Sequence, residues 1–217
     1  HFKPQTVNWR LQGINKYLEF IKKDRLKMKF VKVQQKNFLE NVISDADYKF
    51  LKAKLKKEGF TDWYFVVWFL TATGARVSEL LQIKVEHVYA GFLDLYTKGG
   101  KIRRIYIPKK LMEEAIIWLQ EDNRQTGYLF LNRFGERITS RGVAMQLKHF
   151  AEKYGLNTKV VYPHSFRHRF AKNFLDRFND IALLADLMGH ESIETTRIYL
   201  RRTATEQKQI VDKIVNW

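Results

Sequence analysis

The stretch LMGHESIETTRIYL (187–200) places His190 and Tyr199 nine residues apart, with a glycine before the histidine and mostly polar residues between them. The tyrosine has two interpretations. It is one more core aromatic in a chain with 10 Tyr, 16 Phe and 5 Trp, or it is a nucleophile. A tyrosine taken alone is more often a core residue, so the choice depends on what the rest of the chain supplies.

The charge balance indicates a polyanionic partner. The 217 residues include 39 Lys+Arg and 23 Asp+Glu, a formal net charge of +16. Such a surface usually binds nucleic acid or an anionic membrane, and a merely solvated basic surface is the alternative. No apolar run approaches the roughly 20 residues of a spanning helix, and the first residues form no signal peptide. We therefore expect nucleic acid and no membrane.

The cysteine content and the first residue give two further expectations about the chain. The sequence contains no cysteine, which excludes disulfides and thiolate metal sites and suits a reducing cytoplasm. It begins with His1 rather than Met, so we expect upstream residues to be missing.

Hydrophobic periodicity predicts a mainly α chain with a small antiparallel β-sheet, an α+β class. A helix over 6–22 with Thr6 as N-cap is followed by a basic, weakly periodic linker (22–38). Ser44 caps a helix over 44–59, which Gly59 ends. The other predicted helices are 61–72, 109–121, 140–154, 163–175, 180–188, 192–200 and 204–216.

Two β-rich runs flank KGGK (98–101), so residues 91–108 read as a hairpin that Pro108 closes. YLFLN (128–132) is a candidate for one more short strand. Lys98 and Lys101 lie in the hairpin tip, where a side chain can reach into a groove or an active site.

Two further stretches contain residues that could do chemistry. TGARVSELL (73–81) places Arg76 where a buried helix ends, and Glu79 in the first turn of the next helix. YPHSFRHRF (162–170) begins a helix in which His164 and Arg167, at i and i+3, share a face.

Each stretch also has a structural explanation. His164 and His168 have the i, i+4 spacing of metal ligands, but neighbouring arginines repel a cation and no HExxH-type glutamate lies between them, so we expect no metal. KGGK lacks the pattern of a phosphate-binding P-loop, so we expect no nucleotide cofactor. An isolated arginine after a glycine is usually a surface residue or a structural ion pair.

Taken together, TGARVSELL, TKGGKIRRIYIP, PHSFRHRFA and LMGHESIETTRIYL resemble the tyrosine recombinase (phage integrase, Xer-like) family in order and spacing. The resemblance begins at about Ser44 and implies the family's catalytic-domain fold over 41–217. Residues 1–40 resemble the C-terminal helix and linker of its core-binding (SAM-like) domain, which we expect to be truncated here.

The resemblance implies a catalytic set of Arg76, Lys98, His164, Arg167, His190 and Tyr199. In it Tyr199 attacks a DNA phosphodiester, which leaves a 3′-phosphotyrosyl bond and a free 5′-hydroxyl. Arg76 and Arg167 stabilise the charge of the transition state, and Lys98 is the general acid for the leaving 5′-oxygen. The resemblance also implies DNA contacts by Lys101, Arg103, Arg141 and Arg169.

The remaining roles follow from the same resemblance. His190 hydrogen-bonds a phosphate oxygen, His164 orients the phosphate or accepts a proton, and Glu79 holds Arg76 in place. Because tyrosine has a pKa near ~10, we expect the surrounding cations to favour the phenolate of Tyr199. Neither a metal nor ATP is required, because the arginines supply the positive charge and the phosphotyrosine conserves the bond energy.

The predicted function is site-specific recombination (integration, excision, inversion or dimer resolution) on double-stranded DNA. The resemblance implies a homo-tetramer on DNA, a monomer in free solution and a bacterial, cytoplasmic, nucleoid-associated location. In the family the segment after the tyrosine commonly docks into a neighbouring subunit. The apolar stripe of 204–216 fits that role, and folding back on its own domain is the alternative. Two alternatives remain, a type IB topoisomerase-like enzyme that relaxes DNA and a non-catalytic DNA-binding protein of the same fold.

Overall fold

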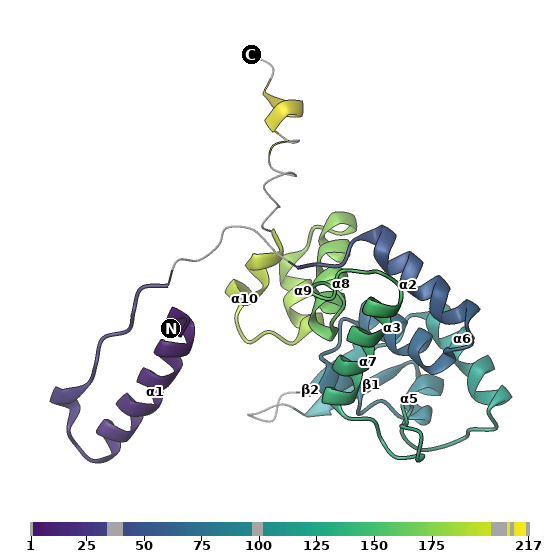
Figure 1. Cartoon of the computed structure of the whole chain (residues 1–217), viewed down its shortest axis with the longest axis horizontal. Coiled ribbons are helices and arrows are strands. Elements are labelled where there is room, and N and C mark those ends of the chain that lie inside the picture. Colours follow the sequence, from purple (N-terminus) through teal and green to yellow (C-terminus); the bar gives the residue numbers. More distant parts are fainter. Residues whose placement is uncertain (1, 34–40, 97–101, 201–207, 209–210, 216–217) are drawn as a thin grey trace. The chain divides into compact units, whose positions relative to one another are not determined.

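The computed structural model describes residues 2–33, 41–96, 102–200, 208 and 211–215 (Figure 1). The chain divides into two compact units, His1–Asn37 and Phe38–Trp217. All of the buried apolar clusters belong to the second unit. Among the described residues, no helix is long and apolar enough to cross a membrane.

The first unit contains helix α1 (Pro4–Phe20) and the short 3-10 helix η1 (Asp24–Leu26). Helix α1 begins at Pro4, with Lys3 as the flanking residue. Proline suits the first turn because its fixed φ is helical and the missing N–H would have no helical partner there. The predicted N-cap at Thr6 is therefore wrong, because Thr6 lies inside the helix.

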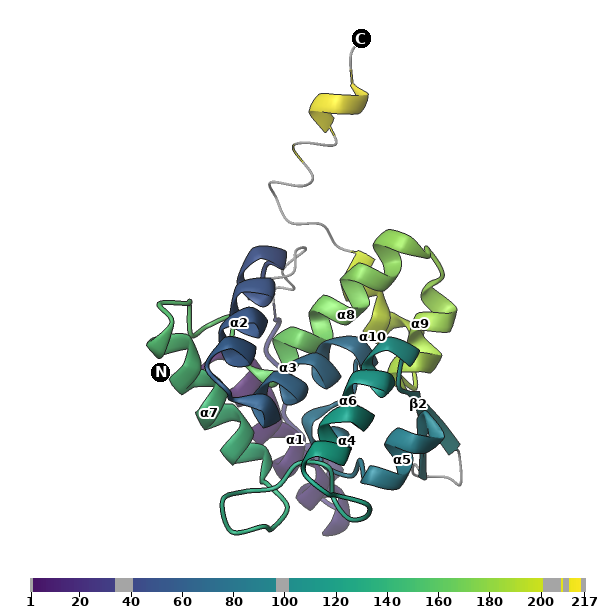
Figure 2. The same ribbon diagram turned by 90° about the vertical axis from the view of Figure 1, so that its right-hand side faces the viewer.

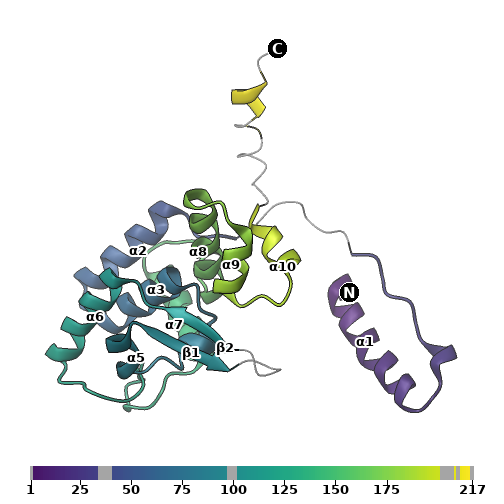
Figure 3. The ribbon, with the colours of Figure 1, turned by 180° about the vertical axis from the view of Figure 1, so that it is seen from behind.

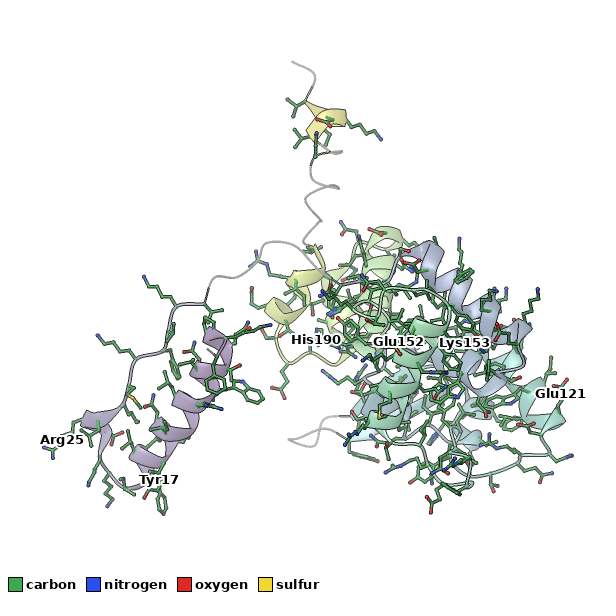
Figure 4. All side chains as sticks on the ribbon, viewed as in Figure 1. Tyr17, Arg25, Glu121, Glu152, Lys153 and His190 are labelled. Atoms are coloured by element: carbon green, nitrogen blue, oxygen red, sulfur yellow. The ribbon has the colours of Figure 1, made fainter. Side chains whose placement is uncertain are left out.

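Two asparagines of α1 hold the segment that follows η1. The side chain of Asn8 exchanges two hydrogen bonds of 2.8 Å with the backbone of Val31. Asn15 exchanges two of 2.9 Å with the backbone of Met28. Part of the predicted linker is thus tied to the helix. No residue of α1 is buried, and Tyr17 projects from its surface (Figure 4).

The second unit is built around helix α3 (Thr61–Thr73), in which nearly every residue from Tyr64 onward is buried. A helix that is apolar on all sides must be covered on all sides. Helices α2 (Asp45–Lys57), α6 (Lys109–Glu121) and α8 (Pro163–Arg177) pack against it (Figure 2). The predicted cap of α2 is confirmed, since the Ser44 hydroxyl accepts a hydrogen bond from the Asp47 N–H.

The predicted hairpin is confirmed as an antiparallel pair of strands, β1 (Phe92–Tyr96) and β2 (Ile102–Tyr106) (Figure 3). Leu93 pairs with Ile105, and both face the core. The hairpin tip, with Lys98 and Lys101, lies outside the described residues. The other helices are α4 (Val77–Leu80), α5 (Val85–Ala90), α7 (Ser140–Lys153), α9 (Ile181–Met188) and α10 (Ile193–Arg197).

Two predicted elements differ in the structure. Residues 128–132 form no strand, because Tyr128 and Leu131 make only isolated bridges, to Lys84 and Arg137. The helix predicted over 192–200 is α10 followed by the 3-10 helix η2 (Ile198–Leu200), which carries Tyr199. Of the predicted helix over 204–216 the structure describes 208 and 211–215, of which 208 and 211–214 are helical.

Candidate active site

Glu79 is a carboxylate shared by three arginines that are distant in the sequence. Its Oε1 accepts hydrogen bonds from Nη1 of Arg76 at 2.7 Å and from Nη1 of Arg103 at 2.5 Å. Its Oε2 lies 3.9 Å from Nη1 of Arg167. Burial by itself would raise the pKa of Glu79, but the charges of Arg103 and Arg76 outweigh burial and hold this pKa below its usual value. The carboxylate is therefore ionised and joins the three guanidiniums.

The end of α3 positions Arg76. Gly74 ends the helix in the left-handed conformation with φ 62°, where a Cβ would lie 2.4 Å from the ring of Phe170. Arg76 then precedes α4, and its N–H donates to Oε2 of Glu79 at 2.7 Å. Its guanidinium also donates to the Gly189 carbonyl at 3.1 Å and is 42% exposed, so part of this cation faces solvent.

Arg167 lies at the centre of the site and is 1% exposed. Nη1 donates to the Gly74 carbonyl, and Nη2 donates to the Met188 carbonyl, both at 2.6 Å. Its Nε is buried without a hydrogen-bond partner among the described residues. Burial, aided by Arg76 and Arg103, lowers the pKa of Arg167 to about 10. The guanidinium therefore stays charged at neutral pH and keeps one unused donor.

His190 (labelled in Figure 4) follows Gly189 at the end of α9. Its Nε2 lies 3.0 Å from Nη2 of Arg167, and its Nδ1 lies 2.7 Å from the Thr196 hydroxyl. Because the guanidinium can only donate, Nε2 is the acceptor and the ring proton is on Nδ1. Burial, followed by the charges of Arg167 and Arg76, lowers the pKa of His190 to about 4. This histidine is therefore neutral.

Tyr199 lies beside His190 and His168. Its ring is nearly parallel to that of His190, with centroids 6.3 Å apart, and its hydroxyl lies 3.1 Å from Nδ1 of His168. Burial raises the pKa of Tyr199, although Arg167 and Arg76 oppose this shift. The cations favour the phenolate as expected, but in the free chain the cost of burying a phenolate is larger.

His164 and His168 occupy successive turns of α8, with ring centroids 4.2 Å apart in an edge-to-face arrangement. His164 is exposed and His168 is buried. Burial of its imidazole, followed by the charges of Arg167 and Arg76, lowers the pKa of His164. The structure therefore places His164 at the solvent side of the site and His168 at the tyrosine.

Two of the predicted DNA contacts occupy buried positions instead. Arg103 is 7% exposed, pairs with Glu79 and donates twice to the Leu187 carbonyl, at 3.1 and 2.8 Å. Arg169 is 6% exposed and forms an ion pair with Asp45. Both guanidiniums are thus buried and paired in the chain without DNA, and a DNA contact at either residue stays a prediction.

Of the other predicted residues, the structure describes the DNA-contact candidate Arg141 but neither Lys101 nor the catalytic candidate Lys98. Arg141 is exposed in the first turn of α7, next to an open cleft of about 790 Å³ that Lys84 and Arg137 line. Lys98 and Lys101 lie outside the described residues. A second cleft of about 680 Å³, between β2 and α9, reaches His190. Both clefts are open enough for an extended ligand to enter.

Sequence reasoning missed the contacts that three residues make at the site. His168 contacts the tyrosine hydroxyl, Thr196 fixes the tautomer of His190, and Arg103 links the hairpin to Glu79. A signal existed for His168, which immediately follows Arg167 and lies one turn after His164. For Thr196, which is six residues from its partner across the start of a helix, the sequence holds no comparable signal.

A tyrosine that shares a pocket with two histidines and a pair of arginines defines the class of the tyrosine recombinases, enzymes that cleave and rejoin DNA. The model of the "Phage integrase family" matches residues 40–206 of the chain. The chain belongs to the phage integrase family.

Similar proteins agree with this assignment. The chain is 31% identical over 217 residues to the tyrosine recombinase XerA of Pyrococcus furiosus, an alignment that covers 96% of this chain and 74% of XerA. It is 35% identical over 150 residues to XerD of Listeria monocytogenes, which covers 65% of this chain and 50% of XerD. The chain thus spans between half and three quarters of the length of these relatives.

Solved structures share the fold. The crystal structure of XerA recombinase superposes with a TM-score of 0.69 at 19% identity, covering 100% of this chain and 78% of the other. The Tn1549 transposon integrase in complex with circular intermediate DNA superposes with a TM-score of 0.74 at 17% identity, covering 99% and 81%.

Proposed function

We propose that this chain is a site-specific DNA recombinase in which Tyr199 attacks a phosphodiester of double-stranded DNA. The phenolic oxygen bonds to phosphorus, the 5′-oxygen leaves, and a 3′-phosphotyrosyl bond results. A second 5′-hydroxyl later reverses the step. The observation that carries the proposal is the contact of His190 with both Tyr199 and Arg167, together with the partly exposed cation of Arg76.

The arginines have different parts in this proposal. Arg76 captures the phosphate from solvent, because its guanidinium is partly exposed. The unused Nε of Arg167 is a fixed donor for a phosphate or phenolate oxygen. Donors that are already held in place need no reorganisation during the reaction, and loss of one typically costs about 10²–10³ in rate. Permanent positive charge of this kind supports a mechanism without a metal or ATP.

Proton transfers complete the proposed cycle. Lys98 protonates the leaving 5′-oxygen, the role that the family resemblance implies. His190 can donate to a phosphate oxygen only when Nε2 carries a proton, and in the free chain Nε2 accepts from Arg167. A bound phosphate offsets the charges of Arg167 and Arg76 that lower the pKa of His190. We expect DNA binding to favour the donating form.

The test is covalent capture. DNA that becomes attached to the protein is recovered and sequenced, and a nicked substrate is built from that sequence. The wild-type chain should form an adduct that survives denaturing electrophoresis, whereas Tyr199→Phe should bind the DNA and form none. An adduct with the Phe variant would remove Tyr199 as the nucleophile.

The proposal also covers the assembly of the protein, and two measurements distinguish it from the alternative functions. We propose a monomer in free solution, a homo-tetramer on two DNA sites, and action on nucleoid DNA in the cytoplasm. Strand exchange between two sites distinguishes this function from relaxation by a topoisomerase IB-like enzyme, and adduct formation distinguishes it from binding alone. The relatives, which are named recombinases, favour neither alternative.

A further inference from the structure

The atom that the proposed function makes reactive has a neighbour without an assigned role. Nδ1 of His168 lies 3.1 Å from the Tyr199 hydroxyl, with ring centroids 5.3 Å apart. His168 is 9% exposed and Tyr199 is 5% exposed. A buried hydroxyl requires a hydrogen-bond partner, because leaving it unpaired costs free energy. This contact therefore constrains where the phenolic oxygen can lie.

The direction of this hydrogen bond follows from the groups around the hydroxyl. The positive charge of Arg167 acts on Tyr199 and favours its phenolate form. Among the described residues, Nδ1 of His168 is the one acceptor within hydrogen-bond distance of the phenolic proton. The phenol therefore donates to Nδ1, and the ring proton of His168 is on Nε2. The lone pairs of the oxygen are thereby left without a described donor.

The surroundings of His168 keep it in this role. Burial, followed by the charges of His164 and Arg167, lowers the pKa of His168 to about 4. A neutral imidazole accepts at Nδ1, whereas a protonated one cannot. His168 is also held by α8, one residue after Arg167, so that the acceptor and the principal cation move together.

We propose that His168 is a further active-site residue, which accepts the hydrogen bond of Tyr199 and so orients the attacking oxygen toward the phosphate held by the arginines. The inference rests on the proposed role of Tyr199 as nucleophile. It separates the two histidines of α8. His164, which is exposed, is left to meet the phosphate, and His168 positions the nucleophile.

The test compares two substitutions with a matched control. His168→Leu removes the acceptor, while His168→Asn keeps an amide oxygen near the place of Nδ1. His149→Leu makes the same change at an exposed histidine of α7. A small displacement of a reacting atom can cost about 10²-fold in rate. We expect His168→Leu to slow adduct formation by about that factor with unchanged DNA affinity, His168→Asn to recover most of the rate, and the control to equal wild type.

Two results would overturn the proposal. A His168→Leu variant that is as fast as wild type, or faster, would show that the bond is dispensable or restrains the tyrosine. Equally slow Leu and Asn variants would show that an acceptor at this position is insufficient. Unfolding of His168→Leu, Tyr199→Phe and the double variant tests the bond itself, since additive effects would contradict it. Failure of wild type to form any adduct would count against the proposed function. The unfolding measurements on the two single variants and the double variant would still decide whether the hydrogen bond exists.

Discussion

Replacing Glu79 by glutamine should destabilise the second unit far more than the loss of an ordinary ion pair. The substitution keeps the shape and removes the one negative charge that Arg76, Arg103 and Arg167 share. Breaking a buried pair costs about 3–5 kcal/mol. Glu79 and Arg103 are 12% and 6% exposed, but Arg76 is 42% exposed and screened by water. We therefore expect the lower value, about 3 kcal/mol.

The matched control is Asp94→Asn. Asp94 receives two hydrogen bonds of 2.7 Å from Arg104, but these side chains are 33% and 44% exposed. A surface pair of this kind contributes little to stability, because water screens its charges. Thermal unfolding should show a Tm lower by roughly 6–12 °C for Glu79→Gln, at about 2–4 °C per kcal/mol for a domain of this size, and little change for the control. Equal losses would refute the shared role of Glu79.

The pH dependence of the same variant has a definite sign. The pKa of Glu79 is lower in the folded chain than in the unfolded chain. Its contribution to stability is therefore present above the unfolded pKa and is lost as the pH falls through the folded value. The stability difference between wild type and Glu79→Gln should shrink in acid, and a difference that grows in acid would contradict the assigned ionisation.

Three further predictions concern other parts of the site. Arg141→Ala should reduce the log–log salt slope of DNA binding by about 0.9, whereas Arg103→Ala should leave the slope unchanged and lower the free energy of unfolding; fluorescence anisotropy over a salt series measures the slope. Gly74→Ala should lower the free energy of unfolding in urea by more than ~1 kcal/mol, because a Cβ would lie 2.4 Å from an aromatic ring at φ 62°. His168 and His190 have pKa values of about 4 in the folded chain, so as the pH falls they take up protons in the unfolded chain before they do so in the folded chain. The free energy of unfolding should therefore decrease as the pH drops below ~6.5. Replacing both histidines by leucine should weaken this pH dependence, which urea unfolding at a series of pH values measures.

Local rules predicted most elements of the second unit. The hydroxyl of Ser44 caps α2, the two β-rich runs pair as antiparallel strands, and α6 begins after Pro108. The errors arose where tertiary contacts or a competing local rule determine the secondary structure. Pro4 starts α1 ahead of a good cap residue, and within 128–132 Leu129 and Phe130 are buried without pairing as a strand.

The motifs predicted which residues would form the site, but not how their charges would be distributed. Arg103 and Ile105 of β2 and Ile107 just after it are two residues apart and all buried, so the strand period itself indicated an inward arginine. The partner of Arg169 could not be predicted, because Asp45 is 124 residues away in the sequence. The pKa of Tyr199 was misjudged because the sequence shows the nearby cations but not the burial that opposes them.

The balance of charge at the site links substrate binding to proton supply. Arg76, Arg103 and Arg167 share one carboxylate, so the cluster has an excess of positive charge without an anion. Arg167 lowers the pKa of all three histidines, His164, His168 and His190. A phosphate bound between Arg76 and Arg167 offsets that charge, and the pKa values of these histidines must then rise. We expect His164 and His190, which are more exposed than His168, to gain protons first when DNA is bound.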